Sequence, residues 1–580
     1  MVFVPREPFG AALPGLAPPR AVPSDLAIAA ASRIVPDDIA QKLVLLAIFM
    51  LGCAGVAALL DREPLLARLA GGVFYVWNPY VGERLIIGQW ALLLGYAGLP
   101  WALRAVLSPD EAPWRWTGRL CLSLVPAVIG GFAAMAITAL VVVPAALLTR
   151  SIRRAAIALT ALAAGSLPWL IPSLQHTVYV DPASVTAFAA RADTPFGSIG
   201  SLLMLGGEWN AQTVPKAYGG AWSILWLAAV IVALAGYVLV ARPQRRWPGL
   251  GLAAVAGLVL AALGVTAAGR DLLRSIISAW PGFAVLRDAQ QFVAPLALAE
   301  AVGFGLAVAA VLNPVPAVPK TELPVRADTP ATAPAVSEPV RPPRAAATVL
   351  GVSKPMLSVR ANAPTTTFGV SEPMRPPRAD APATVLGVPE SERPARVAAA
   401  GTVLGVPESE RPARVAAAGT VLAVLALLAP VLLLPGLAWG AAGRLRPAAY
   451  PAAWLTAARA LDANPAGGSV LLLPWATYRT PPWNHGEVVL DPWTRLLSRP
   501  LIWNDGTQVG DVALAPDDPR ARELASAIRG SGPLTATLRA AGVRFVLDDA
   551  DGPQPQLGPR LPGSVMIIDQ PGLTVYQLPG

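Results

Sequence analysis

Long apolar runs, separated by short polar segments, dominate residues 43–312, and one more run follows at 420–440. About 20 consecutive apolar residues cross the hydrocarbon region of a bilayer. The pattern predicts up to ten membrane-spanning helices; three of them are short and can instead be tilted or re-entrant, so eight to ten are expected. The predicted spans are 43–60, 66–77, 85–107, 119–132, 133–149, 155–175, 221–241, 249–268, 292–312 and 420–440.

A different pattern begins at residue 441, where apolar runs become short. The segments GGSVLLLPW (467–475), GVRFVLDD (542–549) and GLTVYQLPG (572–580) predict strands. The segment DPRARELASAIRG (518–530) predicts a helix, because Asp518 stands near its start and a glycine ends it. A helix between strands predicts a small α/β domain over residues 441–580.

Residues 313–418 contain internal repeats. The segment SEPVRPPRA at 337 recurs as SEPMRPPRA at 371, and TVLGVPESERPARVAAAG at 384 recurs at 402. A tract of Pro, Ala and Arg cannot bury a core, so this segment is predicted to be a disordered linker. A duplicated spacer is favoured over a segment that docks a partner.

The composition fits a membrane protein and excludes several functions. The chain is 54% hydrophobic and 14% charged, with a mean hydropathy of +0.53, which is unlike one soluble globule. The net charge is +9, but no basic stripe alternates with aromatics, so no nucleic-acid partner is predicted. Cys53 and Cys121 fall in apolar runs, and His176 and His485 are the only histidines, which leaves little for a metal site. No P-loop, GxGxxG, HExxH or GxSxG motif occurs, which argues against a nucleotide-driven pump or a serine hydrolase.

Arginine clusters set the predicted orientation. Arginines concentrate at 150–154 and 242–246, in short loops that the positive-inside rule places in the cytoplasm. The linker at 313–418 is then cytoplasmic, and a last span lies within 419–440. The segments predicted outside are the N-terminal loop at 1–42, the loops at 77–90, 176–220 and 269–291, and the domain at 441–580.

The first outer loop reads WNPYVGERLIIGQW (77–90) and carries charges next to the membrane. Pro79 breaks the helix there. The loop is predicted to meet a polar headgroup, with Arg84 on a phosphate and Glu83 on a sugar hydroxyl, because an arginine fork suits phosphate. Asn78 and Gln89 would complete the site. The alternative is a salt-bridged loop that flanking tryptophans anchor at the interface.

Two later outer segments carry further candidates. In LRDAQQF (286–292), Arg287 and Asp288 meet the membrane just before a span, and Glu300 lies within that span. An acid inside a membrane helix is costly and is a functional candidate, although a buried pair between helices is an equal alternative. In LGGEWN (205–210), a carboxylate beside an aromatic ring suggests sugar binding by Glu208 and Trp209.

The N-terminal loop and the C-terminal domain hold the remaining candidates. Glu7 and Asp25 are acids of the N-terminal loop, and Asp37 and Asp38 directly precede the first span, where capping is favoured over a functional role. In the domain, aromatics and polar residues can form a glycan-binding face, but packing onto the membrane bundle or the lipid is favoured. These are Trp475, Trp483, Trp493 and Trp503, with Asn484, His485, Asp491 and Asp505.

With these segments in view, the chain resembles actinobacterial multi-spanning glycosyltransferases of the GT-C type, related to arabinofuranosyl- and mannosyltransferases of the cell envelope. The resemblance rests on PREPFG and PRAVPSD, WNPYVGERLIIGQWALLLGYAGLPW, LLMLGGEWN, LRDAQQFVAPLAL, and LLLPW with WNDG. It covers most of the chain outside 313–418. It is moderately specific for the family and poorly specific for a substrate.

The resemblance implies a mostly helical membrane bundle with an extracytoplasmic α/β domain, and transfer of a sugar from a polyprenyl-phosphate donor to an envelope glycan or lipid acceptor. An acid of the first outer loop would act as the base, and cationic groups would stabilise the leaving phosphate. The family's first span and the start of that loop are expected upstream of Met1. Glu7, Asp25 and Glu83 are therefore the fallback candidates for the base. No cofactor is predicted, and a divalent cation is left open.

Two other functional classes stay open. One is a non-catalytic or transport-type membrane protein that binds a lipid-linked glycan. The other is a scaffold that acts through the cytoplasmic repeat tract. DNA upstream of Met1 that encodes another span followed by an acid would favour the enzyme.

Overall fold

The structure is a computed structural model that describes residues 22–108, 112–174, 180–241, 244, 247–313, 413–510, 512–549 and 557–580. These residues belong to one compact unit. Glu7, His176 and nearly all of the repeat tract at 313–418 lie outside the described residues.

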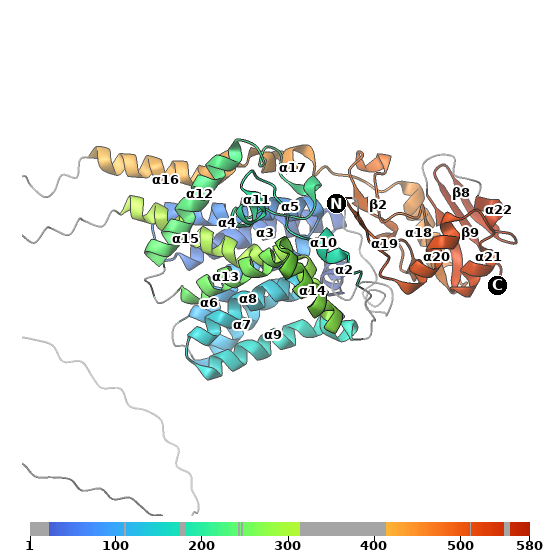
Figure 1. Cartoon of the computed structure of the whole chain (residues 1–580), viewed down its shortest axis with the longest axis horizontal. Helices are drawn as coiled ribbons and strands as arrows, with labels where there is room; N and C mark the ends of the chain where they lie inside the picture. The colour runs from blue at the N-terminus through green and yellow to red at the C-terminus, as the bar shows by residue number, and fades with distance from the viewer. Residues whose placement is uncertain are drawn as a thin grey trace, which may run out of the picture. The chain divides into compact units, whose positions relative to one another are not determined.

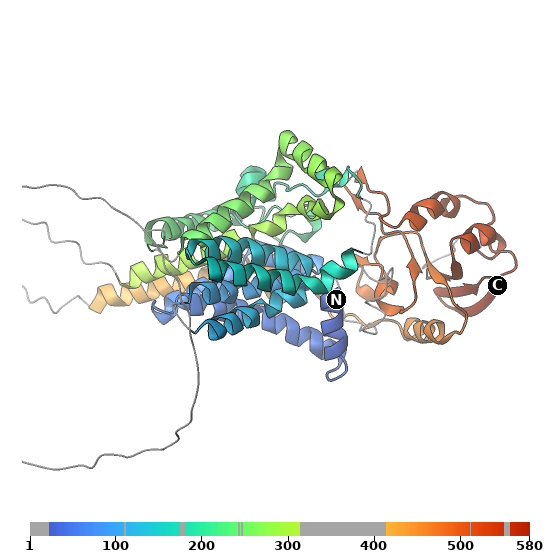
Figure 2. The same cartoon turned by 90° about the horizontal axis from the view of Figure 1, so that it is seen from below.

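A bundle of long helices forms the first part of the unit (Figures 1 and 2). It is preceded by the short helix α2 (Val22–Ala31). The main helices are α3 (Asp37–Leu59), α4 (Leu65–Val76), α5 (Pro79–Ile87), α6 (Trp90–Leu107), α7 (Pro113–Gly130), α8 (Phe132–Leu148), α9 (Ile152–Ser173), α12 (Trp222–Gly236), α13 (Pro248–Ala262), α15 (Ala294–Leu312) and α16 (Ala413–Leu433).

Shorter helices connect the bundle and line its outer segments. They are α10 (Ser184–Ala187), α11 (Gly197–Leu203), η2 (Ala211–Thr213), η3 (Tyr237–Ala241), η4 (Leu263–Val265), α14 (Ala267–Ala279), η5 (Pro281–Arg287), η6 (Ala289–Val293), η7 (Pro435–Leu437) and α17 (Ala438–Gly443).

The predicted membrane-bundle fold class is confirmed, with fewer spans than the eight to ten expected. Six helices in the described ranges are long and apolar enough to cross a membrane, or seven if the pair bent by 61° around residue 434 counts as one span. The number is lower because α4 has only 12 residues and α8 only 17, and because α7 begins with a polar turn that carries Arg115. These were the segments expected to be short or re-entrant.

Asp37 and Asp38 do not cap α3 through their side chains. Both lie in the first helical turn, and the position before the helix is occupied by Pro36, which accepts no capping hydrogen bond. Asp38 instead accepts a hydrogen bond from Lys42 at 3.0 Å. Two acids in a first turn still interact favourably with the helix dipole.

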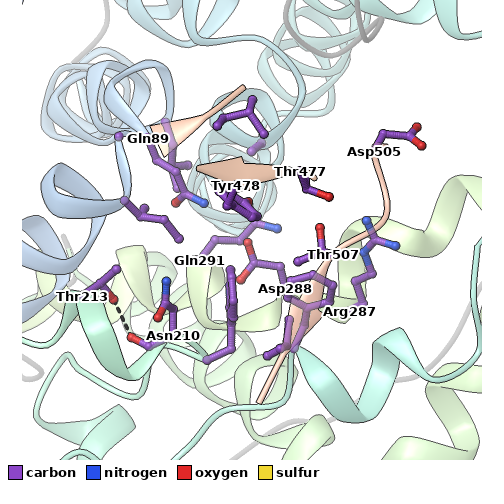
Figure 3. Close-up of a pocket in the computed structure, with 18 of the residues that line it drawn as sticks. Gln89, Asn210, Thr213, Arg287, Asp288, Gln291, Thr477, Tyr478, Asp505 and Thr507 are labelled. Atoms are coloured by element: carbon purple, nitrogen blue, oxygen red, sulfur yellow. Dashed lines mark hydrogen bonds between the residues drawn. The ribbon is translucent and has the colours of Figure 1, made fainter. Parts of the chain in front are cut away.

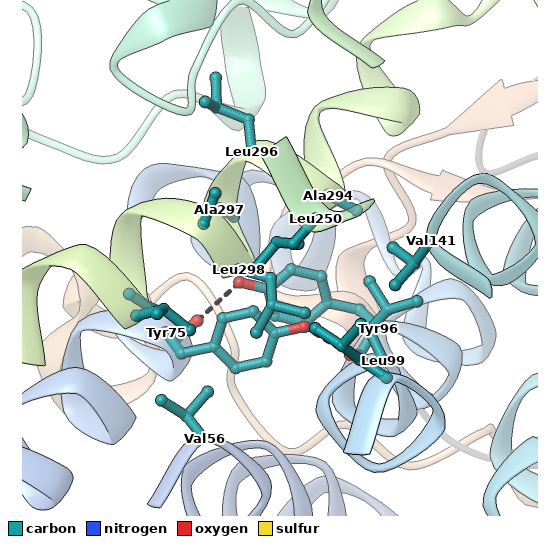
Figure 4. Packing of buried hydrophobic residues seen from close by; sticks show 14 of the residues in the cluster. Val56, Tyr75, Tyr96, Leu99, Val141, Leu250, Ala294, Leu296, Ala297 and Leu298 are labelled. Atoms are coloured by element: carbon teal, nitrogen blue, oxygen red, sulfur yellow. Dashed lines mark hydrogen bonds between the residues drawn. The ribbon is translucent and has the colours of Figure 1, made fainter. Parts of the chain in front are cut away.

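Glycines let the central helix α15 touch its neighbours backbone to backbone. A Cβ added at Gly303 would lie 2.0 Å from the carbonyl oxygen of Ala233 in α12, and one at Gly71 would lie 2.7 Å from that of Ala301. Small residues permit such close approach between membrane helices. Beside this contact, Tyr75 and Tyr96 stack at 4.2 Å, and each hydroxyl donates to the other's main-chain carbonyl (Figure 4).

The C-terminal domain is built on a five-stranded mixed sheet of order β4-β1-β7-β9-β8. β1 pairs in parallel with β4 and β7, whereas β9 pairs antiparallel with β7 and β8. The strands are β1 (Ser469–Leu473), β4 (Leu501–Ile502), β7 (Val543–Asp548), β8 (Val565–Gln570) and β9 (Leu573–Gln577). The three predicted strands are confirmed as β1, β7 and β9.

Helices cover both faces of this sheet. α18 (Ala452–Ala463) packs on the side chains of Val470 and Phe545, and α20 (Pro519–Arg529) with α21 (Thr535–Ala540) packs on those of Leu471 and Val546. The predicted helix is confirmed as α20, whose start Asp518 caps by accepting from the Arg520 amide at 2.9 Å. Small elements complete the domain: β2 (Tyr478–Arg479), η8 (Pro482–Asn484), β3 (Val489–Leu490), α19 (Trp493–Leu496), β5 (Gln508–Val509), β6 (Val512–Ala513) and α22 (Leu557–Arg560).

Candidate functional site

Asn78 forms the joint between α4 and α5. Its Oδ1 accepts a hydrogen bond from the amide of Val81 at 3.0 Å, while its Nδ2 donates to the carbonyls of Phe74 and Tyr75 at 3.1 and 2.7 Å. The side chain is fully buried, and Pro79 follows at the first helical position. In this structure the hydrogen-bonding groups of Asn78 stabilise the break between helices α4 and α5. Its predicted contact with a sugar donor stays a prediction.

Arg84 and Glu208 form a buried ion pair between α5 and the loop at 205–210. The Nη1 of Arg84 donates to the Oε2 of Glu208, and the two side chains are 1% and 0% exposed. The guanidinium also lies 4.4 Å from the ring centre of Tyr80. The hydroxyl of Tyr80 donates to the main-chain carbonyl of Gln291 at 2.9 Å. One arginine thus connects three segments that are far apart in the sequence.

Glu83 and Asp193 lie beside this pair as two adjoining carboxyl groups. Asp193 accepts a hydrogen bond from the amide of Gly207, and its charge acts on Glu83. Burial, followed by repulsion from Asp193 and Glu208, raises the pKa of Glu83 well above its ordinary value. Burial likewise raises the pKa of Asp193 to about 6. Burial and the two neighbouring acids thus favour the protonated form of Glu83.

Glu208 pairs with Arg84, but burial disfavours the charged form of its carboxyl group. Burial raises the pKa of Glu208 to about 7, and the attraction of Arg84 opposes this rise. Several buried atoms of the cluster have no hydrogen-bond partner: Glu83 Oε1, Arg84 Nε and Nη2, and Glu208 Oε1. The cluster therefore retains unused hydrogen-bonding capacity away from water.

A cavity of about 2880 Å³ lies next to this cluster (Figure 3). Its lining on the bundle side includes the segments 85–92, 209–213 and 280–292, and residues 477–495 and 501–520 of the C-terminal domain also line it. The cavity is lined by five of the predicted site residues, Asp25, Gln89, Trp209, Arg287 and Asp288. The other described ones, Asn78, Glu83, Arg84 and Glu208, are buried behind its walls.

Aromatic and cationic groups meet at one wall. Trp209 packs edge-on against Phe188 with ring centres 4.7 Å apart, and the guanidinium of Arg287 lies 5.1 Å from the centre of the same ring. Gln290 donates to the carbonyl of Phe188 at 2.7 Å, which fixes this ring relative to η6. The arrangement places an arginine and an indole next to each other at the cavity surface.

A second wall is apolar and comes from the helices of the bundle. It is lined by Ile86, Ile87 and Trp90 around the α5–α6 junction, and by Phe132 of α8 and Trp169 of α9. The cavity therefore combines a hydrocarbon-like side with a polar side.

Asp25 lies in α2 and is engaged by another residue. It accepts a hydrogen bond from Arg495 and its side chain is 9% exposed. Asp288 lies in the cavity wall between Arg287 and η6, and its charge acts on Arg84, Tyr80 and Glu208. Asp288 thus lines the cavity and also interacts electrostatically with the buried cluster.

The C-terminal domain contains a buried charge cluster that its sequence did not reveal. The Nη1 of Arg479 lies 2.6 Å from Asp549 and 3.6 Å from Asp491, and the indole of Trp493 donates to Asp549 at 2.7 Å. Burial, with repulsion from Asp549, raises the pKa of Asp491 to about 7. Arg479 and Asp549 are 70 residues apart, so no local pattern could have paired them.

The four candidate tryptophans of this domain do not act as one group. Trp493 is buried in the domain's own core and stacks on Trp454 at 4.8 Å, a role that was not among the expected ones. Trp483 and Trp503 line the cavity, so glycan binding by these two residues stays a prediction.

Glu300 is fully buried in α15, and neither of its carboxyl oxygens has a hydrogen-bond partner. No helix-joining pair of the expected kind is formed by this residue. Among the residues with described positions, no three His, Cys, Asp or Glu side chains come together as metal ligands.

Comparison with known proteins reveals a shared fold. No family model and no curated protein matches the chain. The cryo-EM structure of the arabinofuranosyltransferase AftD from Mycobacteria is similar over 100% of this chain and 38% of that one, with a TM-score of 0.52 and 17% sequence identity. A mutant of that enzyme gives a TM-score of 0.51, also at 17% identity, over 98% of this chain. The chain thus spans 38% of the length of the protein whose fold it shares.

Proposed function

We propose that this chain is a membrane glycosyltransferase that transfers a sugar from a polyprenyl-phosphate donor to an envelope glycan or lipid on the outer side of the membrane. The observation that carries the proposal is the cavity, which joins an apolar wall of bundle helices to a wall with Arg287, Asp288 and Trp209. The fold shared with an arabinofuranosyltransferase supports the same class of reaction. Fold alone does not define a function, so the proposal depends on the site.

The two walls suit the two halves of a lipid-linked sugar. The isoprenoid tail would lie against Ile87, Trp90 and Phe132, where apolar contact favours hydrocarbon. The phosphate would lie against Arg287, whose planar guanidinium can donate two parallel hydrogen bonds to phosphate oxygens. Gln89 and Trp209 line the same cavity and would contact the sugar.

Asp288 is our choice for the base among the acids that line the bundle side of the cavity. Asp288 directly follows Arg287, the proposed phosphate contact, and both line the cavity, whereas Asp25 lies in α2 and Glu83 does not line the cavity. The acceptor hydroxyl would attack the anomeric carbon while the Asp288 carboxylate takes its proton. The bond from that carbon to the phosphate oxygen breaks, and its electron pair leaves with the phosphate, whose charge Arg287 stabilises. Attack from the side opposite the phosphate inverts the anomeric configuration.

One observation favours the non-catalytic alternative. Glu83, Arg84 and Glu208, which the sequence offered for catalysis and binding, are all buried behind the cavity wall. A protein that only binds or moves a lipid-linked glycan would need the cavity and no accessible acid.

The deciding experiment is a transfer assay on membranes that contain the full 1–580 chain. Radiolabelled polyprenyl-phosphate-arabinose and polyprenyl-phosphate-mannose are supplied with envelope acceptor extracts. Label that moves to the acceptor, and stops moving in an Asp288→Asn variant that binds the donor normally, supports the enzyme. Binding of donor without transfer by the unaltered chain favours the alternative.

A further inference from the structure

We infer that Arg84 is a positioning residue. Its buried contacts with Glu208 and Tyr80 hold three segments of the cavity lining, which we call the first, second and third walls, at a fixed spacing. These are 85–92, 209–213 and 280–292, respectively. This inference rests on the proposed function, because the reaction is what the positioned walls would serve. It gives Arg84 and Glu208 a role that needs no contact with the substrate.

The contacts of Arg84 reach each wall. Arg84 itself lies in α5, just before the cavity segment 85–92. Its Nη1 donates to Glu208, the residue directly before Trp209, which lines the cavity. Its guanidinium covers Tyr80, whose hydroxyl donates to the carbonyl of Gln291 in the third wall. A shift of this one side chain therefore changes the spacing of all three walls.

The loop that carries Trp209 is also fixed by Asp193. The carboxylate of Asp193 accepts a hydrogen bond from the amide of Gly207. Gly207 has a φ of 92°, a conformation that residues with side chains rarely adopt. The loop that presents Trp209 is thus fastened at two successive residues, Gly207 and Glu208.

Stability alone is a poor reason for this arrangement. Burying two charges has a desolvation cost that their attraction has to offset, and apolar replacements of buried ion pairs are often neutral or stabilising. The pair also leaves Arg84 Nε and Nη2 and Glu208 Oε1 without hydrogen-bond partners among the described residues. Each buried polar atom without a partner adds to the desolvation cost. An arrangement this costly is explained by the geometry that it imposes.

The test separates position from stability by replacing both charges at once. In the full chain, Arg84→Met with Glu208→Leu removes the ion pair but leaves no buried charge behind. We expect normal insertion, an unfolding temperature at or above that of the unaltered chain, and a kcat lower by about a hundredfold, because misplacement by about 1 Å costs that much. The matched control is Arg104→Met with Asp61→Leu, which removes a 3.4 Å ion pair between residues that do not line the cavity.

A second readout does not need activity. In a background with Cys53→Ser and Cys121→Ser, spin labels on Gln212→Cys and Ala284→Cys report the distance between the second and third walls. The inference predicts a broader or shifted distance distribution in the Arg84→Met, Glu208→Leu chain and an unchanged one in the control. If the paired replacement does not insert, Tyr80→Phe takes its place, because it removes only the hydrogen bond to Gln291.

The outcomes distinguish this inference from the proposed function. Full kcat together with an unchanged distance distribution in the altered chain overturns the inference and leaves the proposed function standing. No transfer by the unaltered chain from either radiolabelled donor counts against the proposed function, and the spin-label distances then decide the inference alone.

Discussion

The guanidinium of Arg287 lies 5.1 Å from the centre of the Phe188 ring, which in turn packs edge-on against Trp209. A cation over an aromatic face is attracted by the electron-rich ring, which limits where the guanidinium can lie. This contact joins two predicted outer segments, the loop at 176–220 and the segment 286–292, which the sequence analysis treated separately. Arg287 and Trp209 both line the cavity, so these contacts place a cation beside an aromatic cluster at its surface.

Replacing Arg287 should therefore weaken donor binding. We expect Arg287→Ala to raise the KM for a polyprenyl-phosphate-sugar by about tenfold or more, since a charge-assisted hydrogen bond contributes about 1.5–3 kcal/mol. Arg287→Lys should recover only part of this loss, because an ammonium group cannot donate the paired bonds of a guanidinium. Arg274→Ala, which removes a charge from α14 outside the cavity, is the matched control. Equal KM values for the Arg287→Ala and Arg274→Ala chains would sink the phosphate assignment.

Asp288 should be required for chemistry rather than for binding. We expect Asp288→Asn to reduce kcat by about 10²–10⁴-fold with little change in the donor KM, because an amide cannot accept the acceptor's proton. Asp288→Ala should regain part of its rate when azide or formate is added, since a small anion can enter the vacated space. Asp25→Asn is the comparison, because it alters the other acid on the bundle side of the cavity. A larger loss in Asp25→Asn than in Asp288→Asn would move the base to Asp25.

Asn78 should matter for stability and not for the donor. Asn78→Ala removes the cap of α5 and two further hydrogen bonds to main-chain carbonyls. Loss of an N-cap alone costs about 0.5–2 kcal/mol, so a lower unfolding temperature is expected in detergent. Asn78→Asp keeps the cap acceptor and should lose less. A variant that folds normally but has a raised donor KM would instead restore Asn78 to the donor site.

The stability of the C-terminal domain should depend on pH through Asp491. The pKa of this carboxyl is about 7 in the fold, raised first by burial, against about 3.9 in an unfolded chain. Between these values the folded state binds a proton that the unfolded state does not, so this contribution to stability is full below about pH 4 and is lost as the pH rises towards 7. Arg479 and Asp549 face the same carboxyl and share in the effect.

The measurement is the thermal unfolding of the full chain, followed through tryptophan circular dichroism, at about pH 5 and about pH 8. The unaltered chain should unfold at a lower temperature at the higher pH. Asp491→Asn should show a smaller difference between the two conditions. The same difference in both chains would mean that another group controls the pH dependence.

Local patterns predicted the elements well where sequence neighbours decide the structure. The strands at β1, β7 and β9 and the helix α20 follow from apolar runs and from the Asp518 cap, which act within a few residues. The number of spans was overestimated, because apolar character alone does not reveal that α4 stops after 12 residues. Its end is set by Asn78, whose side chain satisfies the carbonyls that the helix leaves open.

The candidate site was harder to predict, because its geometry depends on long-range partners. The sequence identified charged residues next to the membrane, but it did not show which of them are buried. Arg84 pairs with Glu208, whereas its chain neighbour Glu83 is influenced by the charge of Asp193. Both of these acids lie in a loop more than 100 residues later. The sequence showed only that Asp193 and Glu208 lie in the 180–210 loop. Only the tertiary contacts show which residues these acids interact with.

The glycine contacts of α15 have a consequence for how a substrate can enter. With Gly303 and Gly71 at main-chain contact distance, α15 has no room to slide or rotate against α12 and α4. The segment that carries Asp288 and Gln291 leads directly into this helix, so the packing of α15 also fixes the position of that segment. The lining at 280–292 therefore keeps its place when a substrate enters, and a bulky lipid has to fit the cavity without displacing that segment.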